Sequence, residues 1–170
     1  MEDKKDIVGG DRYKQFLDAI VDMVLVKGPK SVILWANKSF QDYYGMDNKK
    51  LQGMIDASFN EPDYTQQYIK DDKKVFESGQ ILDILEEPVT RYDGVVRIFH
   101  TIKSPIFDDQ GKVIMTIGIS HDITEQKEAD EKLKASFKEL EKLNTSMMDR
   151  ELKMVELKKE NEALKAQHVK

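Results

Sequence analysis

The feature that most constrains this chain is an abrupt change in the spacing of its apolar residues between Gly118 and Leu133. Before this junction the apolar residues follow β-strand patterns, and after it they recur at helical spacing among almost continuous charge. Asp122 can accept a backbone N–H bond as a helix N-cap, and Glu125, three residues on, completes the pattern of a capping box. We therefore expect a compact domain that continues into a long helix without a flexible linker.

Length and composition allow one ordinary domain with an extension. The chain has 170 residues, 35% of them charged, and a formal net charge of -5. This charge gives no reason to expect a nucleic acid or an anionic membrane as partner. The sequence has no apolar run long enough to span a membrane, and its charged start is not typical of a signal peptide. We expect a cytoplasmic protein.

The chemistry available to the side chains argues against an enzyme. With no cysteine, the chain can form neither disulfides nor thiolate nucleophiles or metal ligands. The three histidines lie far apart in the sequence, so we expect no metal site. The chain has no phosphate-binding glycine loop and no nucleophile elbow. The adjacent carboxylates Asp71–Asp72 and Glu86–Glu87 would point to different sides of their elements, and we expect them to be solvated.

The order of expected elements is two strands, a helical insert and three strands. Asp11 can begin a short helix, and a hairpin is expected around the turn at residues 27–30. Residues 37–78 have a mixed helical pattern, with the longest helix from about Asp63. The expected strands are 23–26, 32–36, 81–89, 95–107 and 113–120. Turns of the Asp-Gly kind between the later strands favour an antiparallel meander in an α+β fold.

Beyond Asp122 the helix carries a heptad pattern, which favours a coiled coil. One seam position is occupied by Leu133, Leu140, Met147, Met154 and Asn161, and the other by Leu143, Leu157 and Leu164. Ser136 and Arg150 interrupt the second column, whereas a lone seam asparagine is a device that fixes two parallel strands in register. The helix needs a partner to bury this stripe, and we expect a parallel homodimer. Packing against its own domain or against another protein are the alternatives.

Three local patterns resemble those of the PAS domain family, the sensor modules of bacterial signalling proteins. Residues 33–40, Ile-Leu-Trp-Ala-Asn-Lys-Ser-Phe, resemble the second strand and the entry to the first helix of that family. Residues 105–113, Pro-Ile-Phe-Asp-Asp-Gln-Gly-Lys-Val, resemble its last hairpin. Residues 118–125, Gly-Ile-Ser-His-Asp-Ile-Thr-Glu, resemble its closing Asp-Ile-Thr motif, after which a signalling helix commonly follows. The likeness covers residues 12–127.

The resemblance implies a five-stranded antiparallel sheet with helices over one face, around a pocket for a small ligand or cofactor. It divides the chain into a flexible start at 1–10, a sensor domain at 11–121 and a coiled-coil helix at 122–167. Candidate pocket residues are Trp35, Phe40, Tyr44, Phe59, Tyr68, Phe76, Ile84, Phe99, Met115 and Ile117. Large apolar side chains such as these are more often plain core than ligand contacts.

The absence of cysteine excludes the flavin photochemistry of the family's light sensors, which forms a cysteinyl adduct. Haem is not favoured. Haem-sensing members of the family typically bind the iron through a histidine of the long helix, and the expected helix at 64–78 contains no histidine. Tyr68 or His100 would be the remaining axial ligands. A noncovalent flavin, a small organic ligand or no ligand at all are left open.

The leading hypothesis from the sequence is a non-enzymatic sensory and dimerisation module. In it, Asp122, Ile123 and Thr124 couple the last strand to the coiled coil, and a separate output protein receives the signal. One alternative is a constitutive dimeric scaffold that binds no ligand. The other is the input region of a truncated histidine kinase or cyclase.

Overall fold

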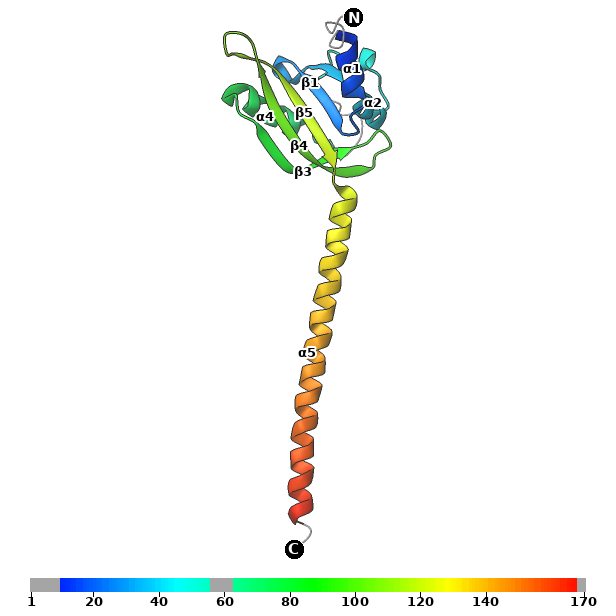
Figure 1. Cartoon of the computed structure of the whole chain (residues 1–170), viewed down its shortest axis with the longest axis vertical. Coiled ribbons are helices and arrows are strands. Elements are labelled where there is room, and N and C mark those ends of the chain that lie inside the picture. Colours follow the sequence, from blue (N-terminus) through cyan, green and yellow to red (C-terminus); the bar gives the residue numbers. More distant parts are fainter. Residues whose placement is uncertain (1–9, 56–62, 168–170) are drawn as a thin grey trace, which may run out of the picture. The chain divides into compact units, whose positions relative to one another are not determined.

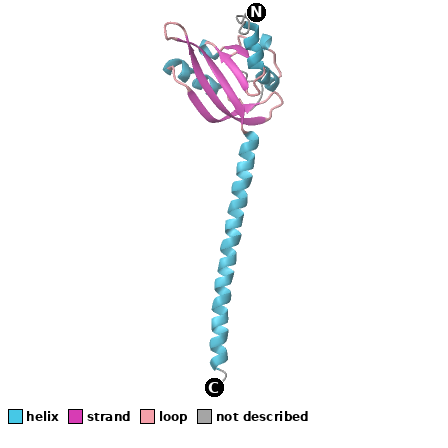
Figure 2. Ribbon diagram, viewed as in Figure 1, coloured by secondary structure: helices cyan, strands magenta, loops and turns pink. Residues whose placement is uncertain are grey.

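The computed structural model describes residues 10–55 and 63–167. Its elements follow the expected order of a hairpin, a helical insert and a meander. Figure 2 shows the helices and strands. They are α1 (Gly10–Asp18), β1 (Met23–Lys27), the 3-10 turn η2 (Pro29–Ser31), β2 (Ile33–Ala36), α2 (Lys38–Tyr44), α3 (Asn48–Leu51), α4 (Thr65–Ser78), β3 (Leu82–Thr90), β4 (Val96–Phe107), β5 (Val113–Asp122) and α5 (Thr124–Gln167). The chain divides into two compact units after Thr124, and each is described by itself.

The first unit is built on one antiparallel sheet of five strands in the order β2-β1-β5-β4-β3 (Figure 1). The first hairpin and the final meander join where β1 pairs with β5, so the last strand of the chain lies in the middle of the sheet. This architecture confirms the predicted α+β fold. The central position of β5 means that both of its edges are paired, one with β1 and the other with β4.

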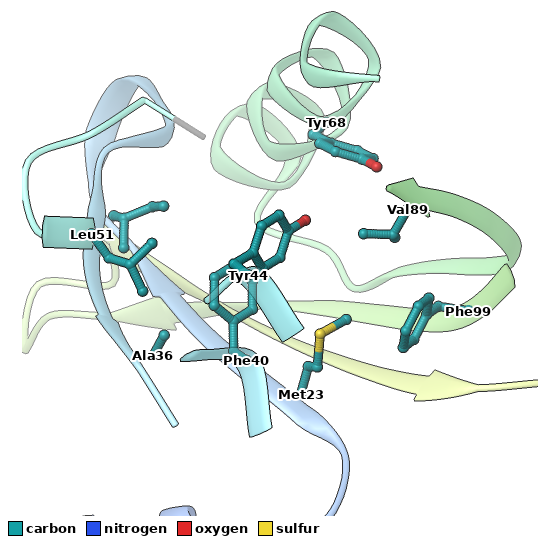
Figure 3. Close-up of a cluster of buried hydrophobic side chains, with 9 residues drawn as sticks. Met23, Ala36, Phe40, Tyr44, Leu51, Tyr68, Val89 and Phe99 are labelled. Atoms are coloured by element: carbon teal, nitrogen blue, oxygen red, sulfur yellow. The ribbon is translucent and has the colours of Figure 1, made fainter. Parts of the chain in front are cut away.

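Helices α2 and α4 pack against one face of the sheet, with α2 against β1 and α4 against β3, β4 and β5. Between them lies a cluster of buried hydrophobic side chains, drawn in Figure 3. Its members are Met23, Ile33, Ala36, Phe40, Tyr44, Leu51, Tyr68, Val89 and Phe99. The rings of Phe40 and Tyr44 stack with their centroids 4.5 Å apart. The cluster therefore draws on both strands of the hairpin, all three helices of the insert and the meander.

Asn37 holds together the segments that surround the first hairpin. This side chain is completely buried, and its Oδ1 accepts hydrogen bonds from the backbone N–H groups of Val24, at 2.9 Å, and Phe40, at 3.1 Å. The bond from Phe40 caps helix α2. The side-chain amide nitrogen of Asn37 lies within hydrogen-bond distance of the carbonyl oxygens of Leu17, Ile20 and Asp22. One amide thus fixes the end of α1, strand β1 and the start of α2.

The second unit is helix α5, which spans 44 residues and begins within two residues of the predicted cap. The six described apolar seam residues, Leu133, Leu140, Leu143, Met147, Met154 and Leu157, are between 52% and 62% exposed in the single chain. Asn161 is also exposed, whereas the side chain of Leu164 lies outside the described residues. Among the described helices, none is long and apolar enough to cross a membrane.

Replacing Asn37 by Ala is expected to lower the free energy of unfolding by about 2–4 kcal/mol, because several buried backbone groups lose their partners at about 1–3 kcal/mol each. Urea denaturation of the two proteins measures the difference. Gln52→Ala serves as the control, since the Gln52 side chain donates one exposed hydrogen bond to Leu34 O. An Asn37 variant as stable as this control would contradict the central role given to the amide.

Candidate ligand cavity and helix junction

A small cavity lies between the inner face of the sheet and helix α4, with a volume of about 50 Å³. One part of its lining is apolar and comes from Met23, Leu25, Phe40, Tyr44, Tyr68 and Val89. The other part is polar and comes from Lys27, Asp72, Glu87, Thr101, Lys103, Thr116 and Ser120. At roughly 10–15 Å³ for one water, the space suits a ligand of a few non-hydrogen atoms.

The polar side of the cavity is organised by a buried chain of charges. Asp72, on α4, receives Lys27 Nζ of β1 at 2.7 Å on one oxygen and Lys103 Nζ of β4 at 2.9 Å on the other. Lys103 Nζ also lies 3.7 Å from Glu87 Oε1 on β3. The exposed fractions of the Lys27, Asp72 and Lys103 side chains are only 5%, 2% and 8%. Helix α4 is therefore pinned to two strands through one carboxylate.

The environment of Asp72 keeps it ionised although it is buried. Burial is the largest influence and favours the neutral acid, but the charges and hydrogen bonds of Lys27 and Lys103 outweigh it and lower the pKa of Asp72 below its usual value. This geometry corrects the expectation that the adjacent carboxylates are solvated, since Asp71, Asp72 and Glu87 are all buried. Asp71 also accepts a bond from Lys74 Nζ, at 2.7 Å. Lys27 and Lys103 reach Asp72 and Glu87 from other elements, so the spacing of these carboxylates in the sequence does not reveal their partners.

A signal for this cluster was present in the strand patterns but was missed. Cross-strand pairing places Lys27 opposite Thr116 and Lys103 opposite Gly118, so both lysines occupy inward positions. Lys27 follows Met23 and Leu25 in a period of two, as a third inward residue. A charged residue at a core-facing strand position predicts either a buried partner or a functional site.

Three of the predicted pocket residues, Phe40, Tyr44 and Tyr68, line the cavity. Phe99 is buried in the hydrophobic cluster, where its ring meets that of Tyr43 edge-on, with centroids 5.3 Å apart. Phe59 lies outside the described residues. Phe76 and Ile84 are partly buried and are not part of the described lining. The structure thus brings Phe40 and Tyr44 of α2 together with Tyr68 of α4 at the cavity.

Met115, Ile117 and Trp35 lie on the opposite face of the sheet, which corrects the expectation that they line the interior. Thr116 and Gly118 belong to the cavity wall, and side chains alternate along a strand, so Met115 and Ile117 face away from the cavity. Trp35 pairs with Val26, while the inward residue of the same strand is Ala36. In the middle of β5, Met115, Ile117 and Ile119 therefore occupy the outer face, and Thr116, Gly118 and Ser120 face inward.

The junction between β5 and α5 is fixed to β4 by backbone and side-chain bonds. Ile123 N donates to Ile98 O at 2.9 Å, and Ile98 N donates to Thr124 Oγ1, also at 2.9 Å. Asp122 accepts from Arg97, at 2.9 Å. Because Thr124 is the first residue of α5, the helix start is tied directly to the strand that carries Thr101 and Lys103.

Asp122 stabilises this junction in a different way from the expected capping box. Its Oδ1 accepts from the backbone N–H of Thr124, at 3.0 Å, and from the Thr124 hydroxyl, at 2.6 Å. A bond to a residue two positions on forms an Asx turn, whereas a capping box bonds the residue three positions on, here Glu125. Burial acts most strongly on Asp122 and opposes ionisation, but the bonds from Thr124 and Arg97 outweigh it and lower its pKa.

The two described histidines lie away from the cavity. His100 and His121 face each other across β4 and β5, and each ring nitrogen is 2.7 Å from a carboxylate oxygen, of Asp83 and Asp22 respectively. Among the described residues no group of three potential ligands could hold a metal ion. The cavity lining, within the described residues, contains no histidine, and about 50 Å³ is too small for a flavin ring or a haem. The cavity as it stands does not fit these cofactors.

The five-stranded sheet, the helical insert and the cavity between them define an α+β domain of the kind expected from the sequence. A family model described as the PAS fold matches residues 17–128, which is more than half of the chain. The chain therefore belongs to the PAS family.

Two curated relatives resemble this domain in sequence. The chain is 32% identical over 111 residues to a diguanylate cyclase of Vibrio cholerae, and the match covers 65% of the chain and 35% of that protein. It is 29% identical over 118 residues to the methanogenesis regulatory histidine kinase FilI of Methanothrix harundinacea, covering 69% of the chain and 13% of the kinase. The chain therefore spans only about a third and an eighth of the lengths of these relatives.

A solved structure supports the fold. The PAS domain of a protein from Colwellia psychrerythraea superposes with a TM-score of 0.58 at 19% sequence identity. The likeness covers 68% of this chain and 97% of that domain. At this level of identity the comparison establishes the architecture.

Replacing Asp72 by Asn is expected to lower the free energy of unfolding at pH 7 by about 3–5 kcal/mol, because two buried ammonium groups lose their shared anion. Since the pKa of Asp72 is lowered by folding, its stabilising effect is complete above its unfolded pKa, about 3.9, and is lost as the pH falls through the folded value. Urea denaturation from pH 7 down to pH 3 should show the two proteins converging in acid.

Asp42→Asn is the matched control for this prediction. Asp42 pairs with Lys38 on the surface, where both side chains are more than half exposed, so its loss should cost no more than about 1 kcal/mol. A difference between wild type and the Asp72 variant that is no larger than that of the control would contradict the assignment of a buried, ionised Asp72.

Proposed function

We propose that the chain is a cytoplasmic PAS sensor and dimerisation module, in which a small molecule binds the cavity and biases the start of α5. The observation that carries this proposal is the shared strand β4: Thr101 and Lys103 belong to the cavity lining, and Ile98 bonds the first residue of α5. A ligand that moves β4 or changes its pairing with β5 therefore acts on the junction within one strand. It can shift that equilibrium only by its difference in affinity for the two states.

The proposed output is a parallel homodimer through α5. Six described apolar seam residues are more than half exposed in the single chain, and a stripe of this length is costly to leave in water. Asn161 at a seam position favours two strands in register. Rotation or splaying of the paired helices is the change that an output protein would detect.

The relatives support a signalling role and leave the output open. One is a diguanylate cyclase and the other a histidine kinase, and this chain matches only part of each. Two outputs fit this role: a separate output protein, or the catalytic part of such an enzyme if the chain is its input region. The net charge of -5 does not favour a nucleic acid as the partner, because nucleic-acid-binding domains usually carry basic surfaces. A constitutive dimeric scaffold remains the alternative, favoured if the cavity never holds a ligand.

Replacing Thr124 by Val tests the coupling at the junction. Valine keeps the shape of threonine but removes the oxygen that accepts the Ile98 N–H bond, together with the hydroxyl hydrogen donated to Asp122. We expect amide exchange at Ile98 and in the first turn of α5 to accelerate about tenfold, which corresponds to the loss of about 1.4 kcal/mol from one hydrogen bond. Hydrogen exchange measured by NMR reports each amide.

Thr145→Val is the matched control, because the Thr145 hydroxyl also makes a local bond on α5, donating to Glu141 O at 2.9 Å. Its exchange at Ile98 should equal that of the wild type. If the Thr124 variant leaves exchange at Ile98 and in the first helical turn unchanged, the junction does not couple the helix to β4.

Native mass spectrometry of the purified chain tests the ligand and the dimer together. We expect the mass of a homodimer carrying a noncovalently bound small molecule. Leu140→Glu places a charge in the seam and should yield monomer, whereas Leu152→Glu changes an equally exposed leucine outside the seam and should leave the dimer intact. A bare dimer would favour the scaffold, and a monomeric wild type would contradict the proposal.

A further inference from the structure

The charges around the cavity point to the kind of ligand that the cavity takes, an inference that rests on the proposed sensor function. Lys27 and Lys103 supply two formal positive charges, and Asp72 and Glu87 supply two negative charges. They alternate along a line from β1 through α4 and β4 to β3. The wall therefore carries both signs of charge with a formal sum of zero.

A balanced wall selects against charged ligands. Inside a buried site, an added charge that finds no opposite charge is strongly disfavoured, because the lost hydration is not replaced. Asp72 already divides its two oxygens between Lys27 and Lys103. A ligand carboxylate or ammonium would have to compete with these short contacts and would leave the cluster with a net charge. An uncharged ligand avoids both costs.

The same wall offers hydrogen-bonding groups of both kinds. Thr101 Oγ1 donates to Ser120 Oγ at 2.9 Å, so the hydrogen of the Ser120 hydroxyl is directed to another acceptor. The Thr116 hydroxyl stands on the same strand, two inward positions away. The Glu87 carboxylate, with several lone-pair sites, can accept from a ligand N–H. The ligand thus meets donors on β5 and an acceptor on β3.

The remaining lining is apolar and aromatic. The stacked rings of Phe40 and Tyr44, together with Met23 and Val89, form this part. A volume of about 50 Å³ leaves room for a compact molecule. The ligand therefore has one apolar side and one polar side within a few non-hydrogen atoms.

From these observations we propose that the cavity binds a small, formally uncharged, amphipathic molecule with a carbonyl-type acceptor beside an N–H or O–H donor, as in a simple amide or lactam. The acceptor meets the hydroxyl groups of β5 and the ammonium of Lys103, and the donor meets Glu87. The hydrocarbon part packs on Phe40 and Tyr44.

Three small compounds of similar size serve as probes: acetamide, which is an uncharged amide, ethylammonium, which is a cation, and acetate, which is an anion. Each is titrated into the full chain at pH 7 while backbone amide shifts are followed by NMR. We expect acetamide to shift the amides of Thr101, Thr116 and Ser120 and to bind at least tenfold more tightly than either ion. Tighter binding of an ion at these amides would overturn the ligand class while leaving a ligand-binding sensor intact.

A charge-altering variant makes the test independent of the absolute affinity. Glu87→Gln keeps the shape of the side chain and gives the wall a net positive charge, so it should bind acetate at least tenfold more tightly than the wild type does. Glu86→Gln alters the exposed neighbouring residue and should not change the order of the probes. Unchanged preference in the Glu87 variant would overturn the charge-balance argument. If none of the probes shifts the cavity amides in either protein, the proposal fails, and the ligand-free scaffold is favoured with it.

Discussion

The contact of Asp72 with Lys27 and Lys103 is the interaction on which the PAS domain depends. It joins residues 45 and 31 positions apart in the sequence and fastens α4 across strands β1 and β4. Burying these charges is expensive, and a hydrophobic core of the same shape would often be as stable. The cluster nevertheless keeps helix and sheet in one position and gives the cavity a polar wall. The helix cannot shift along the sheet without exposing or separating charges.

Strand β4 carries part of the cavity lining and also bonds the start of α5. Lys103 and Thr101 belong to the cavity lining, and Ile98, further back along β4, bonds both Ile123 and Thr124. The central position of β5 adds a second connection, because Thr116 and Ser120 line the cavity on the strand that leads into α5. A sheet is a stiff carrier for such a bias, since its hydrogen bonds fix the register of adjacent strands. The proposed coupling requires only a shift in the backbone hydrogen bonds between β4 and β5.

Local signals predicted most of the fold and only part of the site. The turn at residues 27–30, the later hairpins and the long helix all have short-range chemistry that was visible in the sequence, and the structure has them at nearly the expected places. Phe40, Tyr44 and Tyr68 line the cavity as the sequence predicts, whereas Phe76 is not part of the described lining. The error on β5 came from assuming that its apolar residues face inward. In this strand Met115 and Ile117 face outward, and Thr116 faces the cavity.

The sequence by itself determined the elements, their order and the stripe on α5, because periodicity and turn chemistry act over only a few residues. The tertiary structure decided which face of each strand is inner and which charges are buried. An alternating strand presents two faces, and only its neighbours choose between them. The sequence of α4 does not reveal the two lysines that lower the pKa of Asp72, because these lysines lie on strands far from α4 in the chain. The chemistry of the cavity is therefore a property of the assembled domain.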